Sequence, residues 1–179
     1  MPGWFDLYDW PIGIKAKRDP LGLERSVQSI ETYVDELMSE KGIDRDRIVI
    51  GGFSQGGAIA MQTVYSNQKS GSTSSSTAGS SGEGNENEAY KSYAACVSLS
   101  GWVNFDSVEE TSKGTPLFWG HGKWDDKVLF EQQEVGVTRL VEEFGVTHVE
   151  SESYPMAHSS HPEELKAFAS FLDKILYKE

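Results

Sequence analysis

The sequence has little cysteine and few basic residues, and it lacks long apolar runs. Its single cysteine, Cys96, cannot form an internal disulfide, which fits a reducing compartment. The sequence has 28 acidic residues and 16 Lys and Arg, so its formal net charge is −12. This negative charge disfavours nucleic acid as a partner. No apolar run reaches the length of a membrane span, and Asp6 and Lys15 interrupt the N-terminal segment, so we expect no signal peptide. These absences predict a cytoplasmic protein with no transmembrane segment and at most transient contact with a membrane surface.

The sequence also lacks a metal-binding pattern, because its 4 histidines have no paired spacing and no cysteine cluster exists. We therefore expect neither a metal nor a cofactor. The length of 179 residues suits a single domain over residues 1–179. Residues 67–92 are rich in Ser, Gly, Asn and Glu, have little to bury, and are expected to form a disordered surface insertion. A phosphorylated regulatory segment is the alternative that this composition leaves open.

Helix-like and strand-like segments alternate on both sides of that insertion. Asp19 and Pro20 are typical of a helix start, and apolar residues then recur at helical spacing as far as Met38, before Gly42. Further helices are expected at about 55–65, 128–144 and from residue 162, and strands at 47–51, 94–99, 116–120 and 146–154. Strands that alternate with helices predict an α/β fold, a mostly parallel sheet with helices on both faces.

The most informative segment is Gly-Gly-Phe-Ser-Gln-Gly-Gly at residues 51–57, which follows the apolar run 48–50 and precedes a helix-like segment. A strand, a G-x-S-x-G turn and a helix in this order form a nucleophile elbow, a sharp turn that exposes the serine hydroxyl. Gly52 and Gly56 are expected to let the strand and the helix pack closely around the turn. Ser54 is therefore the candidate nucleophile.

A serine hydroxyl needs a base to take its proton, and the base needs an acid that orients it. In an α/β-hydrolase the acid and then the histidine follow the serine, each at the carboxyl end of a later strand. Asp125 and His158 occupy such positions, and Asp126 is the rival acid. The predicted catalytic set is Ser54, Asp125 and His158.

The other histidines fit proton transfer less well. His121 is expected to hold the loop that carries the acid, His148 to lie on a strand face, and His161 to cap or precede the last helix. Trp102, Trp119 and Trp124 stand near strand ends, where they either line an acyl pocket or simply pack. Cys96 is mid-strand and is expected to be a buried, unreactive thiol.

Several segments together resemble the acyl-protein thioesterases, in the phospholipase/carboxylesterase group of α/β-hydrolases. They are Met-Pro-Gly-Trp-Phe-Asp at 1–6, the elbow region 47–58, Leu-Ser-Gly-Trp at 99–102, His-Gly-x-x-Asp at 121–125 and Met-Ala-His-Ser-Ser at 156–160. The resemblance covers nearly the whole chain except the insertion. It implies that Ser54 is the nucleophile, Asp125 the acid and His158 the base, and that the backbone N–H of Gln55 is an oxyanion-hole donor.

Two departures from the family stand out. Lys123 occupies the position of an aspartate in the family's His-Gly-Asp motif, and it either alters the electrostatics of Asp125 or points to solvent. Met1 corresponds to an internal position of the family, so we expect an N-terminally incomplete chain that lacks the N-terminal strands and the loop with the second oxyanion donor. Residues 48–50 are then expected at an uncovered apolar edge, and one lost donor costs about 10²–10³ in turnover.

The sequence therefore predicts a serine hydrolase. The resemblance implies that its substrates are acyl thioesters on S-acylated (palmitoylated) proteins, and also acyl lipids such as lysophospholipids. Two alternatives stay open. A carboxylesterase for small soluble esters would share every catalytic residue, and a catalytically impaired remnant would act as a binding module.

Overall fold

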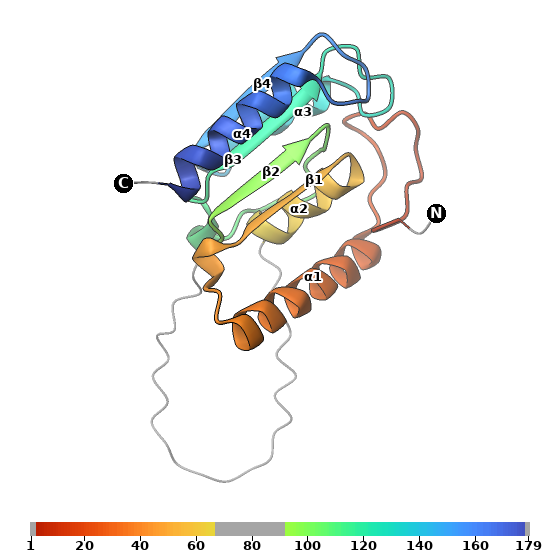
Figure 1. Cartoon of the computed structure of the whole chain (residues 1–179). Helices are drawn as coiled ribbons and strands as arrows, with labels where there is room; N and C mark the ends of the chain where they lie inside the picture. Colours follow the sequence, from red (N-terminus) through yellow and green to blue (C-terminus); the bar gives the residue numbers. More distant parts are fainter. Residues whose placement is uncertain (1–2, 67–91, 178–179) are drawn as a thin grey trace.

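A computed structural model describes residues 3–66 and 92–177. Within these ranges the chain forms a parallel sheet whose strands follow one another in chain order (Figure 1). The strands are β1 (Val49–Phe53), β2 (Ala95–Leu99), β3 (Leu117–Gly122) and β4 (Val149–Tyr154). The insertion expected at 67–92 lies outside the described residues, apart from Ser92.

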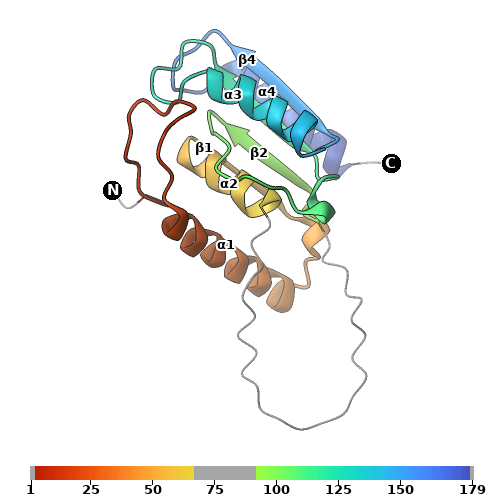
Figure 2. The same cartoon turned by 180° about the vertical axis from the view of Figure 1, so that it is seen from behind.

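Helices cover both faces of this sheet, as predicted. They are α1 (Pro20–Lys41), α2 (Gln55–Tyr65), α3 (Glu131–Thr138), which continues into a π-helical turn (Arg139–Glu143), and α4 (Pro162–Leu176). Figure 1 shows α4 in front of β3 and β4, whereas the view from behind in Figure 2 shows α2 and α3 on the opposite face. Helix α1 packs against α2.

The predicted start and end of α1 are confirmed. The side chain of Asp19 accepts a hydrogen bond from the backbone N–H of Gly22, and Pro20 occupies the first turn. Gly42 ends the helix with φ +63°, the left-handed conformation that favours glycine, and its N–H donates to the carbonyl oxygen of Met38. Local capping chemistry is therefore sufficient to define this helix.

Other boundaries differ from the expectations. Strand β1 begins at Val49 because residues Arg45–Arg47 form a short 3₁₀ turn before it. Strand β4 begins at Val149 and lies at the edge of the sheet, and its residues 150–152 are all exposed. The expected alternation over 146–154 is therefore wrong, and His148 is an exposed residue that precedes the strand.

The core has one apolar layer on each face of the sheet, and a third cluster joins α1 and α2 to the N-terminal segment. Beneath α4, Phe171 packs against Phe118 with ring centroids 5.7 Å apart, beside Val97. On the other face Trp119 packs in a larger cluster with residues of α1, α2 and the π-helical turn. Cys96 is fully buried in that cluster, and burial raises the pKa of its thiol, as expected for an unreactive cysteine.

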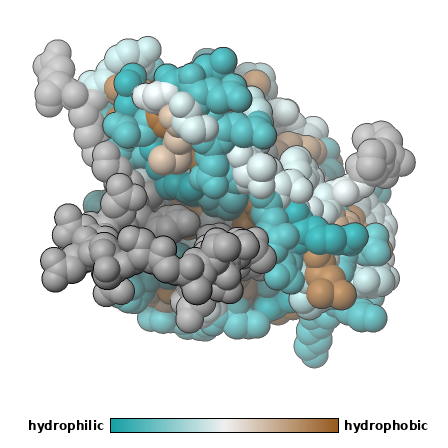
Figure 3. Space-filling view, turned by 90° about the horizontal axis from the view of Figure 1, so that it is seen from below, coloured by the Kyte–Doolittle hydropathy of each residue, from teal (hydrophilic) through white to brown (hydrophobic). Residues whose placement is uncertain are grey.

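Strand β1 lies at the other edge of the sheet and pairs only with β2 within the described residues. The apolar side chains of Ile48 and Ile50 are half-buried against the core, so the predicted edge exposes backbone groups more than apolar side chains. Seen from below, the surface in Figure 3 is mainly hydrophilic, with small scattered apolar groups. Every helix in the described part of the chain is too short or too polar to cross a lipid bilayer.

Candidate active site

Ser54 lies in the turn between β1 and α2 with φ +56° and ψ −120°. This conformation costs a non-glycine residue about 1–3 kcal/mol, and a nucleophile elbow requires it. A hydrogen bond of 2.7 Å from the N–H of Ser54 to the carbonyl oxygen of Leu99 holds the turn in place. A Cβ on Gly52 would lie 2.4 Å from the carbonyl carbon of Gly56, so glycine is required there. A Cβ on Gly56 would meet only Trp4 Nε1, at 4.0 Å, so the close packing expected of both glycines depends on Gly52.

The structure brings the predicted serine, histidine and aspartate side chains together, each from a loop at the carboxyl end of a strand. His158 Nε2 lies 2.9 Å from Ser54 Oγ, and His158 Nδ1 lies 2.8 Å from Asp125 Oδ2. Both are hydrogen-bond distances. Asp125 is 5% exposed, whereas Asp126 is exposed and pairs with the ammonium of Lys127 at 3.2 Å. The geometry therefore favours Asp125 over its rival as the partner of the imidazole.

Asp125 is held by its own loop, residues 122–128, which we call the acid loop. Its Oδ1 accepts hydrogen bonds from the backbone N–H groups of Lys127 and Val128, both at 2.9 Å, which leaves Oδ2 for His158. Bonds from N–H groups to an ionised carboxylate are among the stronger hydrogen bonds in proteins. These bonds therefore hold the carboxyl group of Asp125 aimed at the imidazole.

His121, at the end of β3, holds the acid loop from below. Its Nε2 lies 2.9 Å from the carbonyl oxygen of Val128 and 3.6 Å from Asp125 Oδ2. Burial lowers the pKa of His121, so the ring is neutral near pH 7 and its Nε2–H donates to Val128. This contact agrees with the structural role expected from the sequence.

The acid loop packs closely against the base loop, residues 155–161. The backbone N–H of Trp124 donates to the carbonyl oxygen of Met156 at 3.1 Å, and a Cβ on Gly122 would lie 2.4 Å from the same oxygen. Sequence reasoning missed this contact, although the His-Gly dipeptide signals a position with no room for a side chain. Lys123 is exposed, and its backbone N–H donates to the carbonyl oxygen of Tyr154. The lysine side chain thus belongs to the surface of the loop.

The remaining sequence candidates have structural positions. His161 caps α4 by accepting a hydrogen bond from the N–H of Glu163 at 3.2 Å. Trp119 is fully buried in the core, so packing accounts for it. Trp102 is also buried, whereas Trp124 is 67% exposed beside the site.

The side chain of Gln55 makes two hydrogen bonds that the sequence did not reveal. Its side-chain Oε1 accepts from the N–H of Trp4 at 3.1 Å, and its Nε2 donates to the carbonyl oxygen of Phe5 at 2.5 Å. These bonds tie residues 4–18, which we call the strap, to the elbow. The backbone N–H of Gln55 opens α2 and so has no carbonyl partner within the helix.

Known proteins are similar to this chain in sequence and in fold. A family model described as phospholipase/carboxylesterase matches residues 1–83. Acyl-protein thioesterase 1 from Debaryomyces hansenii is 33% identical to this chain, over 99% of the chain and 69% of its own length. This chain belongs to the acyl-protein thioesterase family of α/β-hydrolases. The resemblance read from the motifs is confirmed, and the family is one of hydrolases.

Plant relatives extend the comparison. A probable carboxylesterase, SOBER1-like, from Arabidopsis thaliana is 31% identical over 96% of this chain and 58% of its own length. The crystal structure of Arabidopsis thaliana SOBER1 superposes with a TM-score of 0.76 at 27% identity, over 97% of this chain and 74% of that one. The α/β-hydrolase fold predicted from the sequence is thereby confirmed. The chain spans 69% of the length of the first of these curated relatives and 58% of the length of the second.

Proposed function

We propose that this protein hydrolyses acyl thioesters on S-acylated (palmitoylated) proteins, and also acyl lipids such as lysophospholipids. Ser54 is the nucleophile, His158 the general base and Asp125 the acid that orients it. The observation that carries the proposal is the pair of hydrogen-bond distances, 2.9 Å from Ser54 Oγ to His158 Nε2 and 2.8 Å from His158 Nδ1 to Asp125 Oδ2. The thioesterase names of the relatives support the choice of substrate.

The reaction proceeds in two acyl-transfer steps. Ser54 Oγ attacks the thioester carbonyl carbon while His158 Nε2 takes the hydroxyl proton, and the oxyanion accepts a hydrogen bond from the N–H of Gln55. The intermediate collapses to the acyl-serine as the carbon–sulfur bond breaks, and His158 gives its proton to the leaving thiolate. Water, deprotonated by the same imidazole, then releases the acid and restores the serine. Asp125 keeps the imidazole in the required tautomer and stabilises its cation.

Apolar side chains exposed around the elbow support an acyl substrate. Phe53 packs on His158 with ring centroids 4.8 Å apart, and it remains 40% exposed. Trp124 in the acid loop is 67% exposed, and Trp4 is bonded to the elbow through Gln55. Exposed apolar surface beside a polar catalytic set is typical of a binding site for an apolar group.

An active-site probe tests the nucleophile. A fluorophosphonate should label the folded chain, and Ser54→Ala should abolish labelling and lower turnover of a palmitoyl thioester by about 10⁶-fold, because no other group on the chain replaces the hydroxyl. Ser159→Ala is the matched control, since Ser159 is an exposed serine of the base loop, and labelling should persist. Labelling of the Ser54→Ala variant would move the nucleophile elsewhere.

The carboxylesterase-like relative from Arabidopsis favours a second candidate function, hydrolysis of small soluble esters. The two candidates share the same catalytic residues and differ in the acyl group that they accept. Comparison of kcat/KM for a long-chain acyl thioester with that for a short-chain ester separates them, and we expect the long-chain thioester to be preferred. A folded monomer that turns over neither substrate would instead favour a binding module.

A further inference from the structure

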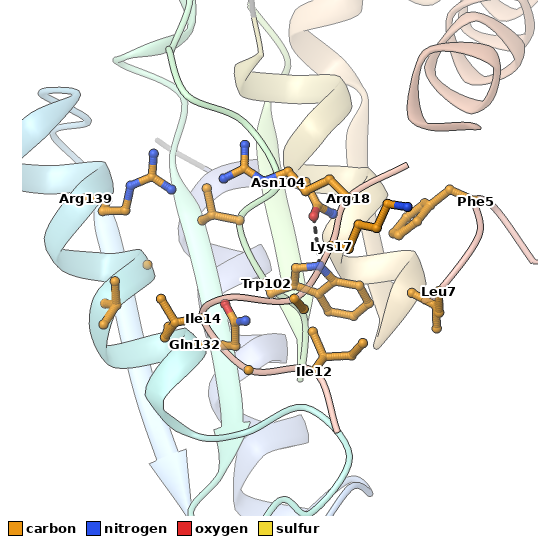
Figure 4. Close-up of a pocket in the computed structure, with 15 residues that line it drawn as sticks. Phe5, Leu7, Ile12, Ile14, Lys17, Arg18, Trp102, Asn104, Gln132 and Arg139 are labelled. Carbon is orange, nitrogen blue, oxygen red and sulfur yellow. Dashed lines mark hydrogen bonds between the residues drawn. The ribbon is translucent and has the colours of Figure 1, made fainter. Parts of the chain in front are cut away.

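A small cavity lies beneath the strap, outside the set of residues assigned to the reaction. The strap, the segment after β2 and helix α3 enclose it (Figure 4), and its volume is about 60 Å³. One water needs about 10–15 Å³ in this measure, so the cavity holds roughly four to six water-sized groups. That space suits acetate or phosphate and is too small for a long acyl chain.

The cavity is lined by a buried side-chain amide whose NH₂ group lacks a hydrogen-bond partner among the described residues. Asn104 is 7% exposed, and its Oδ1 accepts the indole N–H of Trp102 at 2.9 Å. Its Nδ2 is buried and has no hydrogen-bond partner among the residues that the structure describes. A buried donor left unpaired costs about 1–3 kcal/mol, and such groups are rare in folded proteins. The side chain of Gln132, also buried, lines the same cavity.

Positive charge gathers at the same place. Lys17, Arg18 and Arg139 all line the cavity, on a chain whose net charge is −12. Asp106 pairs with Arg18 at 2.8 Å and with Arg139 at 3.4 Å, and Glu143 pairs with Arg139 at 3.3 Å. Neither carboxylate lines the cavity. The carboxylates of Asp9 and Glu131 also accept hydrogen bonds from the backbone N–H groups of Lys17 and Ile14, so the three cations do not outnumber the carboxylates around the cavity. Each guanidinium nevertheless has five N–H donors to share.

Apolar groups complete the lining on the other side. In Figure 4 the side chains of Arg18, Arg139 and Asn104 lie on one side of the cavity, and Ile12 and Leu7 lie on the other. An orphan amide donor and cations on one side, opposite an aliphatic wall, match a small molecule that carries an anionic group on a short apolar body.

We propose that this cavity binds a small oxyanion, a carboxylate or a phosphate. An anionic oxygen accepts a hydrogen bond from Asn104 Nδ2 and faces the charges of Arg18 and Lys17, and a short aliphatic part of the ligand lies against Ile12. The site is separate from Ser54 and needs no chemical step. Its occupancy is therefore measured by binding alone, whether or not the chain hydrolyses thioesters.

The test is a titration of the folded chain with acetate, butyrate and inorganic phosphate at constant ionic strength, with chloride as the reference anion. The indole N–H of Trp102 reports on the site by NMR because it is bonded to Asn104, and Trp102→Phe assigns its signal. We expect that signal to shift with a Kd on the order of 1 mM for at least one probe. Tighter binding of butyrate assigns the site to short-chain carboxylates, and tighter binding of phosphate assigns it to phosphate-bearing ligands.

Two variants decide whether the named groups are responsible. Asn104→Asp keeps the acceptor for Trp102 but replaces the orphan donor with a negatively charged oxygen, so affinity should fall by at least about 10-fold. Lys17→Gln should weaken binding by about 3-fold. Lys15→Gln, a neighbouring exposed lysine outside the cavity lining, should leave binding unchanged.

The proposal is overturned if no probe shifts the Trp102 signal, or if Asn104→Asp binds as well as the native chain. Thermal melting verifies that each variant is folded. If Asn104→Asp does not fold, the Lys17→Gln and Lys15→Gln pair decides, and equal affinity in those two variants contradicts the proposed site.

Discussion

Two carboxyl groups are buried near β3, and their surroundings could hardly differ more. Asp125, in the acid loop, accepts hydrogen bonds from two backbone N–H groups and from His158. Glu164, in the first turn of α4, is fully buried, and neither of its oxygens has a hydrogen-bond partner within the described residues. It lies against Gly120, where a Cβ would be 2.3 Å from Glu164 Oε1. Burial is common to both groups, so what distinguishes them is the set of hydrogen-bond donors around each one.

The largest expected effect comes from replacing Asp125, the buried carboxyl group that is surrounded by hydrogen-bond donors. Asp125→Asn should lower kcat for a thioester by about 10⁴-fold, because an amide no longer holds the imidazole of His158 in the productive tautomer. Asp126→Asn is the matched control: Asp126 is exposed and does not contact His158, so its kcat should stay within about 2-fold of native. Equal losses in the two variants would contradict the assignment of the acid.

A smaller effect is expected from separating the acid loop and the base loop. Gly122→Ala adds a Cβ 2.4 Å from the carbonyl oxygen of Met156, so the loops must move apart and kcat should fall by about 10²-fold. A Cβ on Gly114 meets nothing within 4 Å, so Gly114→Ala should leave kcat unchanged. Denaturant unfolding measures the stability of both variants, so that a loss of folded protein is distinguished from a loss of kcat. An unaffected Gly122→Ala enzyme would show that the contact is not needed.

The smallest expected effect concerns Glu164, the buried carboxyl group without a hydrogen-bond partner in the described part of the chain. Burial raises the pKa of Glu164, and the nearby backbone N–H of His161, which does not reach hydrogen-bond geometry with either carboxyl oxygen, offsets part of the rise. A raised pKa in the folded state means that ionisation opposes folding, so the penalty is absent below the unfolded pKa and grows as pH rises through the folded one. Glu164→Gln removes the charge and should stabilise the protein by about 1 kcal/mol at pH 8, with little change at pH 4.

The neighbouring Glu163 sharpens this prediction because its sign is opposite. Glu163 is exposed, and Lys166 lowers the pKa of its carboxyl group. Glu163→Gln should therefore lower stability slightly at pH 8, where Glu164→Gln raises it. Denaturant unfolding of both variants at pH 4 and pH 8 makes the measurement. A Glu164→Gln protein that is less stable than native at pH 8 would mean that an unseen donor satisfies the buried carboxylate.

Much of this molecule could be predicted from local patterns. The caps at Asp19 and Gly42 gave the limits of α1, and Pro162 gave the start of α4. Two of the predicted boundaries, the start of a strand and the start of a helix, were wrong. The 3₁₀ turn Arg45–Arg47 displaced the start of β1, and the helix expected over 128–144 began at Glu131 and widened into a π-helical turn. Apolar periodicity indicates which face of an element is buried, but it does not distinguish an α-helical turn from a 3₁₀ or π-helical turn.

The candidate site was also predictable only in part from the sequence. The elbow motif and the order of acid and histidine named Ser54, Asp125 and His158 as candidates. The Gln55 bonds to the strap and the cavity beside Asn104 had no sequence signal, because each joins segments far apart in the chain. An asparagine at position 104 is unremarkable until its Nδ2 is found buried and unpaired.

The sequence by itself determined the elements that depend on local chemistry: the capped helices, the sharp turn at Ser54 and the family to which the chain belongs. Only the tertiary structure decided which of two adjacent aspartates faces the imidazole. It also decided which buried carboxyl group is solvated by N–H donors. The reason is physical, because capping and turn preferences act over a few residues, whereas burial and donor supply depend on which distant strands and loops pack together.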